Sequence, residues 1–233
     1  MSKINFKAGK ENIVGKILGK SPEVLSDFIL FHGAGKSTKE RAKEFFDESL
    51  FDVVPSIVTF DFSGHGESTG ELKKSSLKQR VLEAQTAIEL FTTKEKLTVC
   101  GSSMGGYIAL KMLSLYDVKN LVLFAPAIYN KQALEVPFDQ GFTEILRKPD
   151  SWKNSDVLEA LEKFSGNLLL FIGKNDEVIP SGVVDLIDKH SANVARKEII
   201  RFDDCPHAIH SWLDSHSTEK KQVAEKISQC YLI

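Results

Sequence analysis

The stretch Leu97-Thr-Val-Cys-Gly-Ser-Ser-Met-Gly-Gly106 decides how this chain folds. It begins as a short apolar run typical of a buried strand, and apolar side chains recur at helical spacing over residues 104–116. The G-x-S-x-G pattern between them is centred on Ser103. A sharp strand-to-helix turn needs small residues two positions before and after its centre, and Gly101 and Gly105 stand there. The stretch therefore predicts a tight turn that points the Ser103 hydroxyl into an open crevice.

Short apolar runs and helical patterns alternate along the rest of the chain. Five runs flanked by turn residues are expected to be strands, at 27–33, 56–62, 120–125, 167–173 and 198–202. Apolar residues spaced along 77–88 predict a helix between two of these strands. This alternation predicts right-handed crossovers and a doubly wound, mostly parallel sheet, with residues 4–6 and 13–17 as an antiparallel edge. We expect residues 1–233 to form a single α/β domain.

Residues 127–163 interrupt this alternation, because these 37 residues separate two predicted strands where a simple crossover needs fewer. The segment is rich in apolar side chains and is punctuated by prolines. We interpret it as a small helical lid inserted at the carboxyl edge of the sheet, with Tyr129 and Phe138 as candidate substrate-binding residues. The alternative is an ordinary helix with a long surface loop.

The composition argues against several classes of function. The 233 residues are 42% apolar and 27% charged, which allows a sizeable core, and the formal net charge is −2. Without a basic excess, we expect no nucleic-acid partner. The three cysteines lack CxxC and Cys/His ligand spacing, so we expect neither a disulfide framework nor a metal site. The sequence shows neither a secretory signal nor an apolar run of about 20 residues, so we expect a cytoplasmic protein without a membrane span.

A serine hydroxyl needs a base, and that base needs an orienting carboxylate, to act as a nucleophile. His207 follows the last predicted strand, at the edge of the sheet where functional groups gather, and we favour it over His210. Asp176 lies in the turn after strand 167–173 and is the candidate acid, with Glu177 as the adjacent alternative. Asp203 and Asp204 are weaker candidates for this role.

Two backbone amides are candidates for an oxyanion hole. The Met104 N–H lies at the start of the predicted helix, where free N–H groups and the helix dipole favour an anion. The Ala34 N–H lies in the small-residue stretch 32–35, which follows the predicted strand residues Phe28–Phe31. In that stretch, Gly33 and His32 are candidate substrate-binding residues, and we expect His32 to fix the loop by hydrogen bonding.

The same loop resembles the end of a phosphate-binding loop, because Gly35, Lys36 and Ser37 follow a predicted strand. The full motif, G-x-x-x-x-G-K-[ST], needs a glycine at position 30, where Leu30 stands within the strand. Without that glycine the loop cannot wrap a phosphate as the motif requires. We therefore expect no nucleotide cofactor.

Together these motifs resemble the α/β-hydrolase superfamily. They are H-G-x-G at 32–35, D-x-x-G-H-G-x-S at 61–68, G-x-S-x-G-G at 101–106, G-x-x-D-x-x-x-P at 173–180, and His207. They occur in the order of that family, as do nucleophile, acid and base. The stretch at 61–68 is most similar to a branch that includes serine aminopeptidases, monoacylglycerol lipases and bacterial cinnamoyl or feruloyl esterases. That branch usually has arginine where Ser63 stands, so the resemblance implies that any role of that arginine is absent here.

The residues and the resemblance predict an α/β-hydrolase fold and a serine hydrolase with the triad Ser103, Asp176 and His207. We expect it to cleave a carboxylic ester of a short or medium acyl group, or of an aromatic acid, through an acyl-enzyme and without a cofactor. A thioesterase, amidase or peptidase would use the same residues. A non-catalytic ligand-binding module on the same scaffold is an alternative of another class. A small-molecule acyl substrate is the expected partner, and the chain is expected to be a monomer or homodimer.

Overall fold

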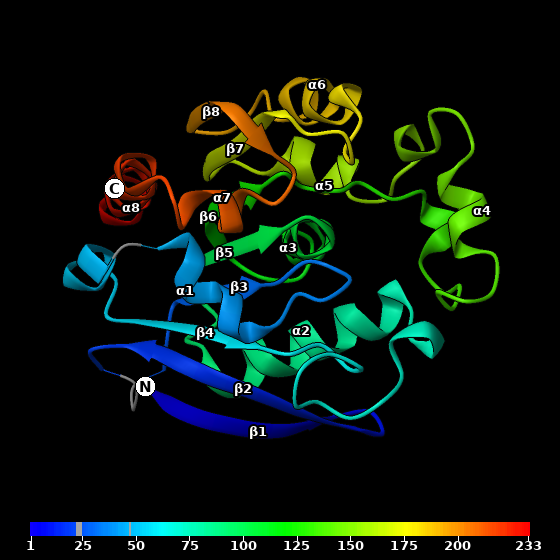
Figure 1. The fold of residues 1–233 in the computed structure, drawn as a ribbon, viewed down its shortest axis with the longest axis horizontal. Helices are drawn as coiled ribbons and strands as arrows, with labels where there is room; N and C mark the ends of the chain where they lie inside the picture. Colours follow the sequence, from blue (N-terminus) through cyan, green and yellow to red (C-terminus); the bar gives the residue numbers. More distant parts are fainter. Residues whose placement is uncertain (22–24, 47) are drawn as a thin grey trace.

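Eight strands form one sheet in the computed structural model, which describes residues 1–21, 25–46 and 48–233 (Figure 1). Their order across the sheet is β1-β2-β4-β3-β5-β6-β7-β8. The strands are β1 (Ser2–Ala8), β2 (Glu11–Gly19), β3 (Phe28–Phe31), β4 (Ser56–Phe60), β5 (Leu97–Ser102), β6 (Val118–Phe124), β7 (Asn167–Asn175) and β8 (Arg196–Pro206). The sheet is parallel from β4 to β8, and β2 runs antiparallel to both β1 and β4. The predicted doubly wound, mostly parallel sheet is confirmed.

Helices cover both faces of the sheet, because side chains of the central strands alternate between two apolar layers. In β7, Leu168 and Leu170 pack into one layer, and Leu169 and Phe171 pack into the other. Buried residues of α2 (Leu77–Phe91), α3 (Met104–Met112), α5 (Leu158–Lys163) and α6 (Ser181–His190) belong to the first layer. Those of α1 (Ala42–Phe45), α7 (Ile209–Leu213) and α8 (Ser217–Leu232) belong to the second. The short 3-10 helices η1 (Lys39–Arg41), η2 (Glu48–Asp52) and η3 (Leu72–Lys74) lie in the connections.

Short helices make up the segment 127–163 between β6 and β7. They are η4 (Lys131–Ala133), α4 (Phe142–Leu146), η5 (Ser151–Lys153) and α5. The end of the segment is part of the main core, because Val157 and Leu161 are buried in the same layer as α2 and α3. The α4 region projects away from the sheet (Figure 1). Its action as a lid stays a prediction.

No helix within the described part of the chain is long and apolar enough to cross a membrane. The three cysteines, Cys100, Cys205 and Cys230, are free and buried. Cys100 and Cys230 belong to the core layer beneath α1, α7 and α8, where they pack as small apolar side chains.

Candidate active site

The turn between β5 and α3 holds Ser103 in a strained conformation, with φ 52° and ψ −117°. A side chain at Gly101 would overlap the carbonyl of Gly105, and one at Gly105 would overlap the carbonyl of Phe31. The Ser103 N–H donates to the Phe124 carbonyl of β6 at 3.0 Å. Non-glycine residues adopt such a conformation only where the surroundings impose it, and these contacts do so here.

Three side chains far apart in the sequence meet at the carboxyl edge of the sheet. The Ser103 hydroxyl donates to His207 Nε2 at 3.0 Å, and His207 Nδ1–H donates to Asp176 Oδ2 at 2.8 Å. The other oxygen, Asp176 Oδ1, accepts the N–H groups of Val178 and Ile179 at 2.8 and 2.9 Å. The turn after β7 thus holds the carboxylate, the carboxylate holds the imidazole, and one ring nitrogen is left to accept the serine proton.

The other candidates for the base and the acid lie outside this hydrogen-bonded chain. His210, on α7, faces Glu44, with 3.9 Å between Nε2 and a carboxylate oxygen, and burial lowers its pKa. Glu177 is exposed. Asp203 forms an ion pair with Lys174, and Asp204 is exposed. The structure therefore brings together Ser103, Asp176 and His207 and places these alternatives in other contacts.

The loop after β3 lies directly against the serine. A side chain built on Gly33 would come within 3.3 Å of Ser103 Cβ, so the Gly33 backbone lies against the serine side chain. Met104 is the first residue of α3, and the first N–H groups of a helix have no partner within that helix. The two amides selected from the sequence, Ala34 and Met104, thus belong to the two segments that flank the hydroxyl.

His32 anchors the start of this loop. Its Nδ1–H donates to the Gly33 carbonyl at 2.6 Å, and its Nε2 accepts the Phe62 N–H at 3.0 Å. Burial, with His65 nearby, lowers the pKa of His32 to about 3, so the ring stays neutral and keeps both bonds. Both ring nitrogens are thus used within the protein, and substrate binding by Gly33 and His32 stays a prediction.

A buried ion pair anchors the other end of the loop. The Lys39 ammonium lies 2.7 Å from Asp61 Oδ2 and 2.7 Å from Glu67, and the Lys39 N–H donates to Asp61 Oδ1 at 2.7 Å. Burial would raise the pKa of Asp61, but Lys39 and the backbone N–H groups hold it below its usual range. Asp61 begins the motif at 61–68, but Lys39 was not predicted as its partner, because nothing in the local sequence pairs residues 22 positions apart.

Ser63 contacts the guanidinium of Arg80, a residue of α2. Arg80 Nη1 donates to the Ser63 carbonyl at 2.7 Å and to the Ser63 hydroxyl at 2.9 Å. Glu83, also fully buried, accepts from Arg80 at 3.2 Å and from the Ser63 N–H at 3.1 Å. This guanidinium comes from a residue 17 positions further along the chain, so the absence of the role that the branch's arginine has at position 63 stays a prediction.

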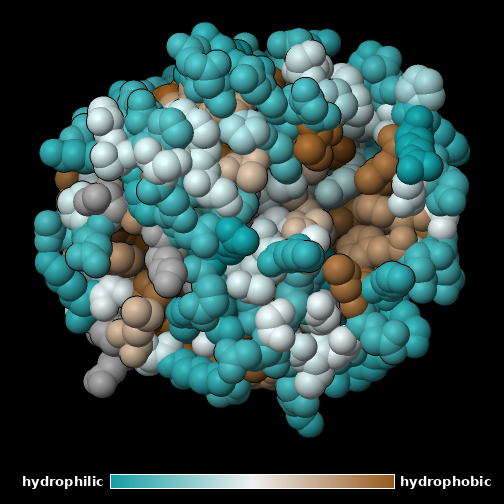
Figure 2. All heavy atoms as spheres, viewed as in Figure 1, coloured by the Kyte–Doolittle hydropathy of each residue, from teal (hydrophilic) through white to brown (hydrophobic). Residues whose placement is uncertain are grey.

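Aromatic side chains from α3 and the segment 127–163 pack against one another and form an aromatic wall. Tyr107 packs against Tyr129 at 5.2 Å between ring centroids, Tyr129 against Phe142 at 5.6 Å, and Phe142 against Phe138 at 4.8 Å. Figure 2 shows a hollow with hydrophobic residues along its side, next to the region of α4. Tyr129 and Phe138, both selected from the sequence, thus lie in this aromatic wall.

A separate pocket of about 440 Å³ adjoins Asp176. Its walls include Pro126, Ile172 and Ile179. In the three stretches that the structure describes, no cluster of three or more His, Cys, Asp or Glu side chains could hold a metal ion.

The buried Lys39–Asp61 pair gives a prediction about stability. Replacing Lys39 with methionine leaves the fully buried Asp61 carboxylate without its ammonium, so we expect the free energy of unfolding to fall by about 3 kcal/mol. Lys3→Met is a matched control, because the exposed Lys3 ammonium binds the same Glu67 at 2.6 Å. Urea denaturation measures the unfolding free energy of both variants. Equal midpoints for the two variants would contradict the anchoring role.

The neutral state of His32 gives a prediction about pH. The unfolded chain binds a proton at this histidine near pH 6.5, whereas the folded protein does so only near pH 3. Lowering the pH therefore favours the unfolded state, by about 1.4 kcal/mol per pH unit between pH 6 and pH 4. His32→Gln, which cannot titrate, should reduce the slope of the unfolding free energy against pH by about that amount. Parallel curves for the two proteins would rule this out.

Comparison with known proteins shows the family of this chain. The family described as "Serine aminopeptidase, S33" matches residues 23–152, which is more than half of the chain. No curated protein matches the sequence at a significant level.

Solved structures share the fold across the whole chain. Est1E from Butyrivibrio proteoclasticus, solved with ferulic acid bound, has a TM-score of 0.74 and 16% identity over 99% of this chain and 100% of its own. The Pyrococcus furiosus esterase Pf2001 has a TM-score of 0.69 and 19% identity over 99% and 92%. The thioesterase domain from the curacin biosynthetic pathway has a TM-score of 0.69 and 16% identity over 96% and 98%. By the family match and the sheet, this chain belongs to the serine aminopeptidase (S33) family and is an α/β-hydrolase.

Proposed function

We propose that this chain is a serine hydrolase that cleaves a carboxylic ester through an acyl-enzyme. The observation that carries the proposal is the unbroken chain of hydrogen bonds from Asp176 through His207 to Ser103. A serine that lacks a base is a poor nucleophile, and a base without a carboxylate is poorly oriented. All three groups occur here within hydrogen-bond reach.

In the first half of the reaction, His207 Nε2 takes the hydroxyl proton as Ser103 Oγ attacks the ester carbonyl carbon. Asp176 keeps the proton on Nδ1 and stabilises the imidazolium that forms. The carbonyl oxygen becomes an oxyanion, to which the amides of Ala34 and Met104 donate; one such donor lowers the barrier by roughly 3–4 kcal/mol. The tetrahedral intermediate collapses, the alkoxide takes the proton from His207, and the alcohol leaves.

In the second half, His207 removes a proton from water, which attacks the acyl-enzyme at the same carbonyl carbon. The second oxyanion occupies the same site, and collapse returns the proton to Ser103 and releases the acid. No step needs a metal or an organic cofactor.

The cleft supports a short or medium acyl group, or an aromatic acid, as the substrate. Its aromatic wall of Tyr129, Phe138 and Phe142 offers flat apolar surface. Est1E, solved with ferulic acid, and the esterase Pf2001 share the fold, and their names are consistent with ester chemistry. The thioesterase domain with the same fold makes a thioester the natural second substrate to test.

The proposed nucleophile can be tested by covalent labelling. A fluorescent fluorophosphonate should attach to the wild-type protein at Ser103, and Ser103→Ala and His207→Gln should abolish labelling and lower kcat for p-nitrophenyl butyrate by about 10³-fold or more. Ser102→Ala, one residue away in β5, is the matched control and should still label. Labelling that persists in Ser103→Ala would refute the assignment, and an unlabelled wild-type protein would favour a binding module.

The size of the cleft can be tested with esters of increasing acyl length. We expect kcat/KM to be highest for p-nitrophenyl butyrate or octanoate and lower for acetate and laurate, because a longer chain must extend beyond the aromatic wall. A butyryl thioester and a butyryl 4-nitroanilide measured alongside rank the three bond types. A maximum at laurate would show that the cleft accepts long chains and would contradict this proposal.

A further inference from the structure

The pocket beside Asp176 lies where β6 and β7 end, with α6 on its other side. Its volume of about 440 Å³ falls within the range of roughly 300–1,000 Å³ that is usual for small-molecule sites. Neither Ser103 nor His207 is among the residues that line it, so the bond that breaks lies outside this pocket. The pocket is therefore suited to a more distant part of a substrate.

The turn 125–127 joins this pocket to the nucleophile. Pro126 lines the pocket, and the next residue, Ala127, donates its N–H to the Ser103 carbonyl at 3.0 Å. A side chain built on Gly106 of α3 would come within 2.6 Å of Pro126, so this turn also packs on the start of the helix that follows the serine. A substrate held at Ser103 thus reaches the pocket by extending across Pro126.

The inner part of the pocket is apolar. Ile172 of β7, Ile179 and Val184 of α6 line it, and all three belong to the core layer that α6 covers. The Asp176 carboxylate also lines the pocket, but Oδ1 accepts two backbone N–H groups and Oδ2 accepts His207 Nδ1–H. This part of the pocket therefore favours an apolar segment, and the charge of Asp176 disfavours a second carboxylate next to it.

Exposed charged side chains line the mouth of the pocket. They are Lys174 of β7, Arg201 of β8 and Asp185 of α6. Lys174 forms an ion pair with Asp203 at 2.5 Å, whereas Arg201 has neither a hydrogen bond nor an ion pair within the described part of the chain. Arg201 is opposite Ile172 in the register of β7 and β8, so its side chain leaves the sheet on the side of the apolar floor.

An unpaired guanidinium beside an apolar floor selects a carboxylate on an apolar stem. A guanidinium is always charged, and its planar N–H groups match the two oxygens of a carboxylate. Of the charged groups at the mouth, two are cations on the strand wall and one, Asp185, is an acid on the helix wall. A carboxylate is therefore stabilised on the side of Arg201 and repelled on the side of Asp185.

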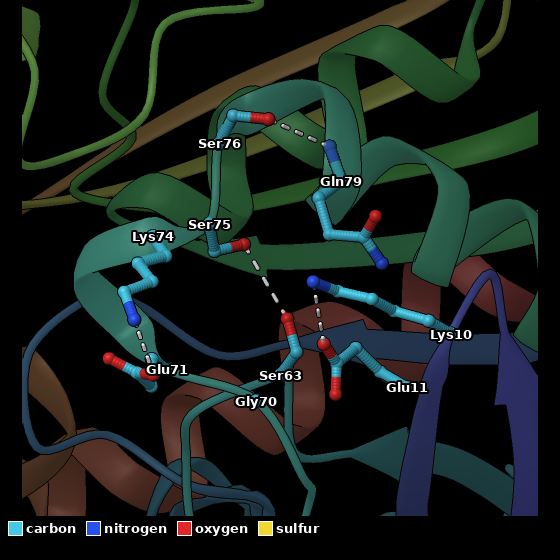
Figure 3. A pocket seen from close by; sticks show the side chains of 9 residues that line it. All are labelled: Lys10, Glu11, Ser63, Gly70, Glu71, Lys74, Ser75, Ser76 and Gln79. Atoms are coloured by element: carbon cyan, nitrogen blue, oxygen red, sulfur yellow. Dashed lines mark hydrogen bonds and ion pairs between the residues drawn. The ribbon is translucent and has the colours of Figure 1, made fainter.

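The polar pocket beside Ser63 differs in this respect. This pocket, of about 250 Å³, is also lined by charged side chains (Figure 3). Each of its two cations lies beside an acid, with Lys74 2.7 Å from Glu71 and Lys10 4.0 Å from Glu11. Its lining therefore carries no uncompensated charge that would select an ionic ligand.

We propose that the pocket beside Asp176 binds the far end of the substrate and that Arg201 binds a carboxylate carried there. This inference rests on the proposed ester hydrolysis at Ser103. It narrows the substrate class to esters with an anionic end, in the acyl or the leaving part, joined to the reacting group by an apolar stem. Ile172 and Val184 contact the stem, and the Arg201 guanidinium donates to the carboxylate at the mouth.

Esters that differ only in the charge of one end test the inference. Monomethyl adipate is compared with its uncharged analogue, methyl 6-amino-6-oxohexanoate, and with the cation methyl 6-(trimethylammonio)hexanoate. The leaving part is tested in the same way with 3-carboxypropyl butyrate and 4-amino-4-oxobutyl butyrate. A charge-assisted hydrogen bond predicts an about 10-fold higher kcat/KM for the anionic member of one series. Ratios near one in both series, or a preference for the cation, would overturn the proposal.

Variants link the preference to the mouth of the pocket. Arg201→Gln removes the charge and the planar fork, so the ratio of anionic to amide ester should fall to about one to two. Asp185→Asn removes the opposing acid and should raise the ratio about two- to threefold. Arg147→Gln, at an exposed arginine of the segment 127–163, is the matched control and should keep the wild-type ratio.

A preference that survives Arg201→Gln would overturn the assignment. If that variant does not fold, Asp185→Asn still decides, because an unchanged ratio would show that the anionic end does not bind at this mouth.

Binding without turnover separates this inference from the proposed function. Calorimetry on Ser103→Ala measures the affinity for the anionic and the amide esters of both series. One anionic ester should bind about 10-fold more tightly than its amide, and Ser103→Ala combined with Arg201→Gln should lose the difference. If the wild-type protein hydrolyses no ester but this difference is found, the hydrolase proposal fails and the carboxylate site stands. Equal affinities in both series would remove the site whatever the activity.

Discussion

The close approach of two backbone segments at Gly101 and Gly105 is the constraint on which the candidate site depends. Any side chain at either position would overlap a neighbouring carbonyl, so the chain reverses within the space of one residue. That reversal forces the positive φ of Ser103 and makes it the cap of α3. The strain is held by bonds to a neighbouring strand and its loop, since Ser103 N–H donates to Phe124 and its carbonyl accepts from Ala127. The serine is therefore fixed by the same contacts that join β5 to β6.

The parallel sheet brings the other segments of the site together. Parallel strands end at one edge, so the loops after β3, β5 and β7 and the end of β8 converge there however far apart they lie in sequence. The loop after β4 then supports the loop after β3 through two buried contacts, His32 to Phe62 and Lys39 to Asp61. Burying a charge pair is costly unless hydrogen bonds satisfy it, and Asp61 accepts from two backbone N–H groups besides Lys39.

Local patterns explain why the fold and the meeting of three residues could be predicted from the sequence. The G-x-S-x-G turn, the apolar runs and the turn after β7 each depend on residues within a few positions of one another. Lys39 and Arg80 could not be found in this way, because their partners are fixed by how loops pack rather than by spacing. Lys36 is the opposite case, a local pattern without a matching structural role. It completes part of a phosphate-loop pattern, yet its side chain is exposed. The segment 127–163 was predicted only in part, because its apolar residues belong to two places. Some form the aromatic wall, whereas Leu161 packs in the core.

A triad alone does not select a substrate, because the same three groups serve esters, thioesters and amides. Selection must come from surfaces that touch the rest of the substrate. The wall formed by Tyr129 and Phe142 is aromatic and rewards apolar area, which discriminates weakly, since one methylene group changes rates by only about 10- to 200-fold. Polar groups discriminate more sharply, because a buried donor or acceptor that a substrate leaves unpaired costs more than a small loss of apolar area. The sharper discrimination between substrates therefore depends on the polar groups that meet the acyl and leaving parts of the substrate, rather than on the triad.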